Sequence, residues 1–548
     1  MKKYKILALA IFACVTLNGW AQSEDNVTGR VLDEKGKPVA GALVSVEENP
    51  LVRVATDKNG RFEITAVKGS RLKVQTGDDA MKVVKIENGS ELTVVMDYSS
   101  EKVNYGFGLQ QTNAESTGAV STVYAENIDK SSAFSIGNSL YGNVLGLTTM
   151  QSTGVVWEQM PSMYIRGLKT LNGNNGILLV VDGLERDNNW QALKYITPEE
   201  VESVSVLRDA AALALYGYRG VNGVVNIVTK RGKYDTREIN FSYDHAFNYM
   251  TRKPELADAY TYAMAQNEAL YYDGLPLQYT KRDLERFKDG TNPNYYPNVN
   301  WYKEGTRNFS ENNQFNVMMR GGGKRVRYMA LLDYKNKFGL LNEDYTHYSD
   351  RYNSQIRTYE LGLRMNLDVD ITSSTRMKFG LYGIIGEDKR PNTDINTIFQ
   401  NFYKVPAAAF PVKTLNNNWG SNTLFKMNPI AAIADVGYVQ ENRRMLETDM
   451  RITQDFSMFL KGLSAEVAVA YDNTATFQDI GSKTYKYEVG YLSEEGLPVS
   501  ETYGTDSKVQ ITKSVLSAQL IRASVEAKLN YDYTSGKHQL SASAVYRQ

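Results

Sequence analysis

The sequence predicts a mainly β protein made of a small N-terminal β-sandwich, a compact α/β domain and an incomplete antiparallel transmembrane β-barrel. Three observations lead to this fold class. Short strand patterns separated by Gly, Asn and Pro turns fill residues 27–97. Buried strands alternate with helical turns in residues 113–232, and long segments of period two follow from Arg237 to the end.

Residues 1–21 form the expected signal peptide, with three lysines, the apolar run Ile6–Val15 and small residues before Gln22. The single cysteine, Cys14, lies in that run, and a lipoprotein anchor there is the alternative interpretation. The mature chain then has no cysteine, which excludes a disulfide scaffold and a thiol catalyst. The 62 basic and 62 acidic side chains of the whole chain indicate no nucleic-acid partner.

Residues 22–97 predict the sandwich. Strand-like runs such as Ala42–Val46 and Arg61–Ile64 alternate with turns at Gly36 and Gly60. The block contains no histidine or cysteine and therefore offers no zinc site. We expect a spacer or a partner-docking module.

Residues 113–232 predict the compact α/β domain. Its most informative stretch is Ile196–Gly232. The expected elements are a helix capped by Thr197 with Glu199 and Glu200 serving its dipole, a strand at Val204–Leu207, a helical turn ending at Gly217, a tight turn at Arg219–Gly223, a strand at Val224–Thr229 and, upstream, a strand and turn at Ile177–Gly183. We expect at least one of Gly220 and Gly223 to have positive φ.

Residues 233–548 predict the barrel strands. In Tyr359–Asp370, apolar side chains alternate with polar ones, and similar segments recur. Nine strands are expected, at 237–249, 312–320, 325–336, 358–370, 375–386, 446–459, 463–476, 522–533 and 536–547. A soluble sandwich is the alternative, but segment length, aromatic ends and a strongly polar second face favour a membrane barrel. Short and long links alternate, as in outer-membrane barrels.

The two faces of these strands have different expected surroundings. The outward, lipid-facing set is Leu361, Leu363, Leu367 and Val467, and the lumenal set is Glu360, Arg364, Asp368 and Glu466. Nine strands do not close a barrel, because bacterial single-chain barrels have an even number. We therefore expect a fragment or a truncated reading frame of a longer protein.

No catalytic or metal constellation is visible in the sequence. The three histidines, His245, His347 and His538, are widely separated, and Gly321–Lys324 lacks the spacing of a phosphate loop. We expect no enzyme activity and no cofactor.

The residues from Ile177 to Gly232 resemble the plug domain of TonB-dependent outer-membrane transporters, and the ending Arg219–Gly232 resembles the SusC/RagA-like branch. Residues 113–232 are called the plug below. The plug motif comprises Asp182, Gly183, Arg219, Gly220, Asn222 and Gly223. The sandwich, called the N-terminal domain, resembles the carboxypeptidase-regulatory-like module of that branch. The resemblance implies a barrel of about 22 strands, of which nine are present.

The linker, residues 98–112, holds the expected TonB-engaging segment Lys102, Val103, Asn104, Tyr105 and Gly106. Such a segment adds a strand to TonB. Lys102 and Asn104 interrupt the expected β-branched run, so a plain linker remains the alternative. We expect 101–108 to be extended, poorly ordered and accessible from the periplasm.

The resemblance implies TonB-dependent import of an oligosaccharide or peptide across the outer membrane, with a SusD-like surface lipoprotein as partner. The N-terminal domain and plug would face the periplasm, and the barrel would contact outer-membrane lipid. Loop aromatics that could stack on substrate are Trp301, Tyr302 and Trp419. The segment Tyr296–Trp301 resembles one shared across the family whatever the substrate, so a structural role is favoured for Trp301. The alternatives are a TonB-dependent signal-transducing receptor and a surface-binding or adhesion protein without transport.

Overall fold

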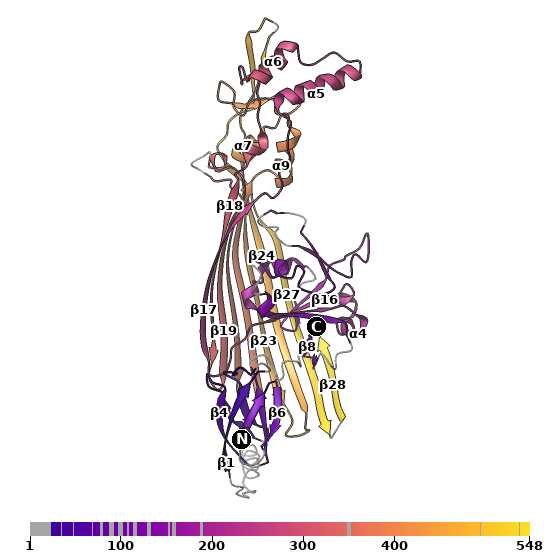
Figure 1. Cartoon of the computed structure of the whole chain (residues 1–548), viewed down its shortest axis with the longest axis vertical. Coiled ribbons are helices and arrows are strands. Elements are labelled where there is room, and N and C mark those ends of the chain that lie inside the picture. The colour runs from indigo at the N-terminus through magenta and orange to yellow at the C-terminus, as the bar shows by residue number, and fades with distance from the viewer. Residues whose placement is uncertain are drawn as a thin grey trace, which may run out of the picture.

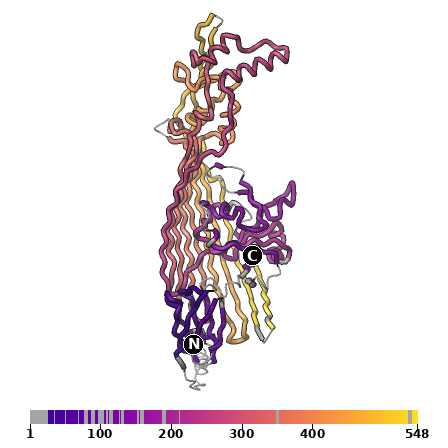
Figure 2. The backbone as a smooth tube through the Cα atoms, in the orientation of Figure 1, coloured from indigo at the N-terminus to yellow at the C-terminus, as the bar shows by residue number. Residues whose placement is uncertain are grey.

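The computed structural model describes residues 24–33, 36–47, 49–67, 69–76, 81–86, 92–96, 102–106, 109–112, 118–128, 133–151, 154–155, 161–186, 190–347, 352–493, 495–535 and 538–548. The expected signal peptide, with Cys14, lies outside these residues. The N-terminal domain lies at one end of the long axis, a tall sheet follows, and helices α5, α6, α7 and α9 lie at the other end (Figure 1). The backbone trace shows most of the long strands lying side by side between these two ends (Figure 2).

The N-terminal domain consists of two small sheets around one apolar core. The strands are β1 (Glu24–Leu32), β2 (Leu43–Val46), β3 (Asn49–Ala55), β4 (Arg61–Val67), β5 (Arg71–Gln75), β6 (Met81–Lys85) and β7 (Leu92–Val95). Their orders are β4-β1-β7 and β3-β2-β5-β6. Val44, Phe62 and Leu72 are buried between the sheets. The predicted sandwich is confirmed.

The plug contains a five-stranded sheet of order β10-β15-β16-β13-β14. The strands are β10 (Val120–Tyr124), β13 (Leu178–Val181), β14 (Leu184–Glu185), β15 (Val201–Leu207) and β16 (Val224–Thr229). Two hairpins accompany them, β8 (Lys102–Gly106) with β9 (Leu109–Thr112) and β11 (Leu147–Met150) with β12 (Ser162–Ile165). The helices are α2 (Ala125–Ile128), α3 (Ile136–Ser139), η1 (Trp190–Tyr195), η2 (Pro198–Glu200), α4 (Ala210–Leu213) and η3 (Ala214–Gly220).

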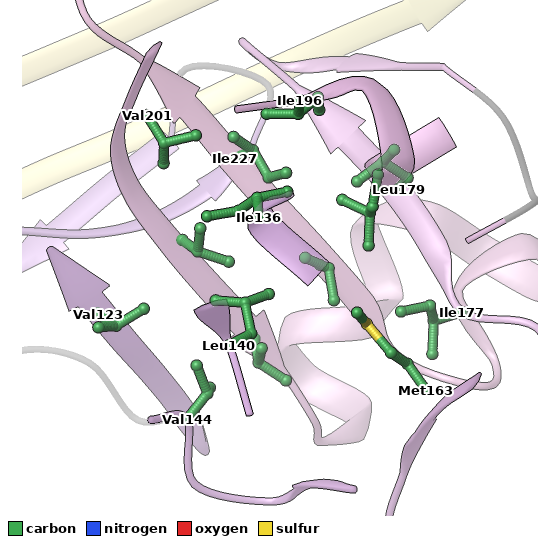
Figure 3. Packing of buried hydrophobic residues seen from close by; sticks show 14 of the residues in the cluster. Val123, Ile136, Leu140, Val144, Met163, Ile177, Leu179, Ile196, Val201 and Ile227 are labelled. Atoms are coloured by element: carbon green, nitrogen blue, oxygen red, sulfur yellow. The ribbon is translucent and has the colours of Figure 1, made fainter. Parts of the chain in front are cut away.

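The plug has its own apolar core. Side chains from β13, β15 and β16 meet those of α3 and β12, and Leu179, Val201 and Ile227 lie among them (Figure 3). The helix expected at Thr197 is only the single turn η2, because strand β15 begins at Val201 directly after it. The predicted strands and the helical turn before Gly217 are confirmed, with φ of 56° at Gly217.

The large sheet contains nine antiparallel strands in the order β17-β18-β19-β20-β21-β23-β24-β27-β28. They are β17 (Arg237–Tyr249), β18 (Phe309–Gly322), β19 (Val326–Phe338), β20 (Arg357–Asp370), β21 (Thr375–Pro391), β23 (Gly437–Asp455), β24 (Leu463–Ser482), β27 (Gln510–Ser535) and β28 (His538–Arg547). The nine predicted strands are confirmed. Several are longer than predicted, because the backbone ladder continues past the segment with alternating apolar side chains.

The long links carry the remaining elements. These are α5 (Ala259–Tyr272), α6 (Lys281–Asp289), α7 (Trp301–Gly305), α8 (Glu343–Thr346), α9 (Ile395–Lys404), α10 (Ala431–Ala434) and the small sheet of β22 (Trp419–Ser421), β25 (Tyr487–Leu492) and β26 (Pro498–Tyr503). The helices in the described part of the chain are all too short or too polar to cross a bilayer.

The large sheet is polar on its covered face and apolar on its open face. On β20, Leu361 and Leu363 are 42% and 39% exposed, whereas Glu360 and Arg364 are 5% and 4% exposed. Leu367 shares the face of Leu363, and Asp368 that of Arg364, because strand residues alternate. On β24, Val467 is 51% exposed, whereas Glu466 bonds with Lys528 on the covered face. The predicted face assignment is confirmed, and it is the reverse of a soluble half-buried sheet.

Candidate functional site between the plug and the large sheet

The Asp182–Gly183 turn ties strand β13 to strand β16. Asp182 and Gly183 both have positive φ, 50° and 83°. The Asp182 carboxylate accepts hydrogen bonds from the Thr229 amide at 2.9 Å and the Thr229 hydroxyl at 2.6 Å. Burial alone would raise the pKa of Asp182, but the Arg231 guanidinium and the Thr229 bonds outweigh it and lower the pKa. Asp182 is therefore a charged, fixed corner of the plug.

The Arg219–Gly223 segment forms the predicted tight turn. The Gly223 amide donates to the Gly220 carbonyl at 2.8 Å. Gly223 has φ of 105°, and a Cβ there would lie 2.5 Å from Ile165. Asn222 donates to the Asn174 carbonyl at 2.7 Å, and Arg219 pairs with Glu185 at 2.7 Å. The prediction of positive φ is confirmed at Gly223, whereas Gly220 lies within η3.

Arg186 joins the plug to two strands of the large sheet. Its guanidinium lies 2.6 Å from Asp449 on β23 and 2.6 Å from Asp472 on β24, and Glu447 lies 3.7 Å away. The Arg186 side chain is only 5% exposed. Sequence reasoning missed this residue, because its partners are more than two hundred residues away in the chain. The only signal was a basic residue between Glu185 and Asp187, shortly after the buried strand and its turn.

A second set of contacts links the plug to strand β20. Glu200 forms an ion pair with Arg364, and both side chains are at most 5% exposed. Arg231 pairs with Asp368 at 2.7 Å. Asn366 donates to the Lys230 carbonyl and the Thr229 hydroxyl, each at 2.8 Å. Polar side chains on the covered face of β20 thus pair with groups of the plug.

The paired acids Glu199 and Glu200 differ in their surroundings. Glu200 accepts a hydrogen bond from the Thr197 amide at 2.8 Å and so caps η2. Of the two acids expected to serve the start of this helix, Glu200 does so here. Glu199 lines a pocket of about 320 Å³ between the plug and strands β17 to β19. Burial, aided by Asp333 and Asp244 and opposed by Lys335, raises the pKa of Glu199 to about 7.

The expected TonB-engaging segment is strand β8, and Val103, Tyr105 and Gly106 are buried in this structure. Val103 and Tyr105 are 3% and 7% exposed and pack with Leu178 and Val180 of the plug. The Tyr216 hydroxyl donates to the Tyr105 carbonyl at 2.7 Å. The extended backbone expected for this segment is confirmed, but the expected accessibility is wrong at Val103 and Tyr105. Because strand residues alternate, Val103 and Tyr105 share one face of β8. This apolar face can pack against the plug, which the prediction of an exposed segment did not take into account. Residues 101, 107 and 108 lie outside the described residues.

The loop aromatics are also placed differently from the expectation. Trp301 and Trp419 are each 1% exposed and belong to the core that packs the long links together. The Trp419 indole donates to Asp435 at 3.0 Å, and that of Trp301 to the Pro406 carbonyl at 3.3 Å. Tyr302 is partly buried against Phe402. The prediction of substrate contact is wrong for both tryptophan rings, and the structural role favoured for Trp301 is confirmed, because each side chain is buried.

Two family models match the chain. The model described as TonB-dependent Receptor Plug Domain matches residues 112–224, and that described as Carboxypeptidase regulatory-like domain matches residues 26–96. The TonB-dependent receptor SusC of Bacteroides thetaiotaomicron is 26% identical over 377 residues, covering 67% of this chain and 35% of that protein. The TonB-dependent receptor P39 of Formosa agariphila is 26% identical over 377 residues, covering 68% and 34%. The chain spans about a third of the length of these curated relatives.

Solved structures share the fold. The RagAB peptide importer in the open-open state matches with a TM-score of 0.59 and 16% identity, covering 81% of this chain and 56% of that one. The RagAB peptide transporter matches with a TM-score of 0.54 and 18% identity, covering 79% and 55%. At these identities the likeness shows the arrangement of sandwich, plug and sheet.

Proposed function

Because the chain is a SusC/RagA-like TonB-dependent receptor of the outer membrane, we propose that it forms part of an energised import route for an oligosaccharide or peptide. Such cargo is too large for passive porins. The family consists of transporters, not enzymes. We also propose that the domains divide at residues 22–97, 98–112, 113–232 and 233–548.

The observation that carries this proposal is the polar contact between the plug and the inner face of the large sheet. The plug's apolar core is internal, and Arg186, Glu200 and Arg231 make its bonds to the sheet. Polar contacts can be exchanged for water when a path opens, whereas an apolar interface would resist hydration. The apolar open face meanwhile suits contact with lipid. The polar covered face and the apolar open face of the large sheet together support a plug that can be displaced inside a membrane-embedded sheet.

TonB is the proposed source of energy, acting on strand β8. A pulling partner adds a strand to an extended segment by backbone hydrogen bonds. In this structure β8 already pairs with β9, and Val103 and Tyr105 are buried. TonB pairing at 102–106 therefore requires that β8 first leave the plug. The plug motif residues are proposed to hold the plug's shape rather than to touch cargo.

The proposed external partner is a SusD-like surface lipoprotein that closes over the long links. These links pack in apolar clusters, one around Trp301 and Trp419 and another around Phe287, which give them a fixed shape on which a lid can seat. The cargo would then be enclosed between lid and links. The aromatic rings of Trp301 and Trp419 support the platform and are not the proposed cargo contacts.

Uptake in the bacterium that encodes the chain tests the proposal. Fluorescent oligosaccharides and peptides are offered to the parent strain, to a strain lacking this gene and to a strain lacking TonB. We expect one cargo class to enter only the parent, while surface binding persists without TonB. Unchanged uptake in both deletion strains contradicts import. Loss of cargo-induced transcription with intact uptake would instead indicate a signalling receptor, and loss of binding alone an adhesion protein.

A further inference from the structure

A cavity of about 1450 Å³ lies where the N-terminal domain, the plug and the large sheet meet. Asp182, Gly183 and Arg231 form its plug side. Hairpin turns of the large sheet form a second side, at residues 372–375, 456–459 and 461–462. The N-terminal domain forms the third, through strands β2, β3, β5 and β6. One wall of the cavity is therefore the N-terminal domain, whose apolar core is separate from that of the plug.

An ion pair joins the N-terminal domain to the sheet. The Arg53 guanidinium lies 3.3 Å from Asp370 at the end of β20, with side chains 18% and 4% exposed. The same Asp370 carboxylate accepts from the Tyr234 hydroxyl at 3.0 Å and from Arg376 at 3.0 Å. Asp370 thus joins the N-terminal domain, the segment that leaves the plug and the first residues of β21.

A close backbone approach lies beside this ion pair. Gly41 has φ of 72°, and a Cβ there would lie 2.7 Å from the Thr236 methyl group and 3.0 Å from the Tyr234 carbonyl. The domain therefore touches the segment leading into β17 at a point where no larger side chain fits. The docking contacts at Arg53 and Gly41 are small and partly polar, which is typical of contacts between domains that separate.

We propose that the N-terminal domain is a gate on this cavity, closed by the Arg53–Asp370 contact, and that cargo leaves the plug only after the domain undocks. This inference rests on the proposed import function. The cavity walls carry charges of both signs, including Lys73, Asp182 and Glu466, so they suit a hydrated polar oligomer. Residues 97–101 join the domain to β8, so a pull on β8 acts directly on the gate.

A reversible cross-link tests the gate. Arg53→Cys and Asp370→Cys are combined in the full protein, and within residues 1–548 the single natural cysteine is Cys14. A short bis-methanethiosulfonate joins the two thiols, and dithiothreitol removes it. We expect cargo uptake to fall at least tenfold when the bridge is complete and to recover after reduction. Surface binding of cargo should stay unchanged. Full uptake with a complete bridge, judged by a gel shift, overturns the proposal.

Matched controls separate the gate from the import function. Each single-cysteine variant receives the same reagent and should import as before. Hydrogen exchange at residues 372–375 is compared in the parent, Arg53→Glu and Lys85→Glu, which reverses an exposed charge on the same domain. We expect faster exchange only in Arg53→Glu. If the parent imports no cargo, the import function fails, and this exchange result alone decides whether the domain docks there. Equal exchange in all three proteins overturns docking through Arg53.

Discussion

Arg186 of the plug and Asp449 of strand β23 form a 2.6 Å ion pair in which the arginine side chain is 5% exposed and the aspartate 10%. Two further carboxylates, Asp472 and Glu447, face the same guanidinium. Arg186 therefore faces three acids on the inner face of the sheet, while Arg522 also acts on Asp472 and Arg231 on Asp449. Removing a buried partner leaves charges without compensation, which costs more than the pair contributes when intact.

Arg186→Met should weaken plug docking by about 3–5 kcal/mol, because three carboxylates lose their shared cation. The measurement is thiol labelling of Val204→Cys, a reporter in the plug core, during urea titration. Arg252→Met, at an exposed arginine outside the plug, is the control and should change nothing. An unshifted midpoint in Arg186→Met would show that solvent already compensates these acids.

Gly223→Ala should destabilise the plug by roughly 1–3 kcal/mol, because an L side chain is strained at positive φ. The added methyl group would also meet Ile165 at 2.5 Å. Gly220→Val should destabilise as well, since a Cβ there lies 2.8 Å from that of Tyr216. The control is Gly323→Ala in a hairpin turn with open space. If the Val204→Cys reporter labels at the same urea concentration in all variants, the turn does not require glycine.

Leu363→Arg and Arg364→Leu should fail in different ways. An arginine among lipid-facing side chains costs about 2–4 kcal/mol at mid-strand, so Leu363→Arg should reduce the amount of the full-length protein assembled in the outer membrane. Arg364→Leu should assemble but expose the plug reporter earlier, because Glu200 loses its partner. Heat-modifiability on gels measures assembly. Equal assembly of both variants would count against a lipid-facing Leu363.

Glu199→Gln should stabilise the plug at alkaline pH and have little effect at acid pH. Burial raises the pKa of Glu199 from 4.5 to about 7, so folding favours the protonated form. The favourable contribution is complete below pH 4.5 and is lost as pH rises through about 7, a difference of roughly 3 kcal/mol. The urea midpoints of Glu199→Gln and the parent are compared at pH 5 and pH 8.5. A constant difference across this range would contradict the shifted pKa.

In the full-length transporter, Val103→Pro should abolish energised uptake while cargo still binds at the cell surface. Proline removes a backbone donor that an added strand needs. Val103→Ala keeps that donor while shortening the side chain, so it separates backbone pairing from packing against Leu178 and Val180. Uptake that survives both Val103→Pro and deletion of 101–108 would place TonB engagement elsewhere, such as Gln22–Asn26.

The sequence was sufficient wherever a local pattern determines the structure. Alternation along Tyr359–Asp370 predicted both the strand and its faces, and the glycines of Arg219–Gly223 predicted the turn. Prediction from the sequence failed where a residue's contact partner lies far away in the chain. Arg186 and Asp370 each contact several distant residues only because the fold brings separate domains together. The burial of Trp301 and Trp419 likewise depends on packing between long links, which no local period encodes.

The plug's separate core has a consequence for cooperativity. Val201, Ile227 and their neighbours pack only with other plug residues in that core, while polar groups make the bonds to the sheet. Units joined by polar contacts unfold independently once those contacts are hydrated. A melting curve of this protein should therefore contain an early transition from the plug and a later one from the strands. A single fitted midpoint would describe neither unit.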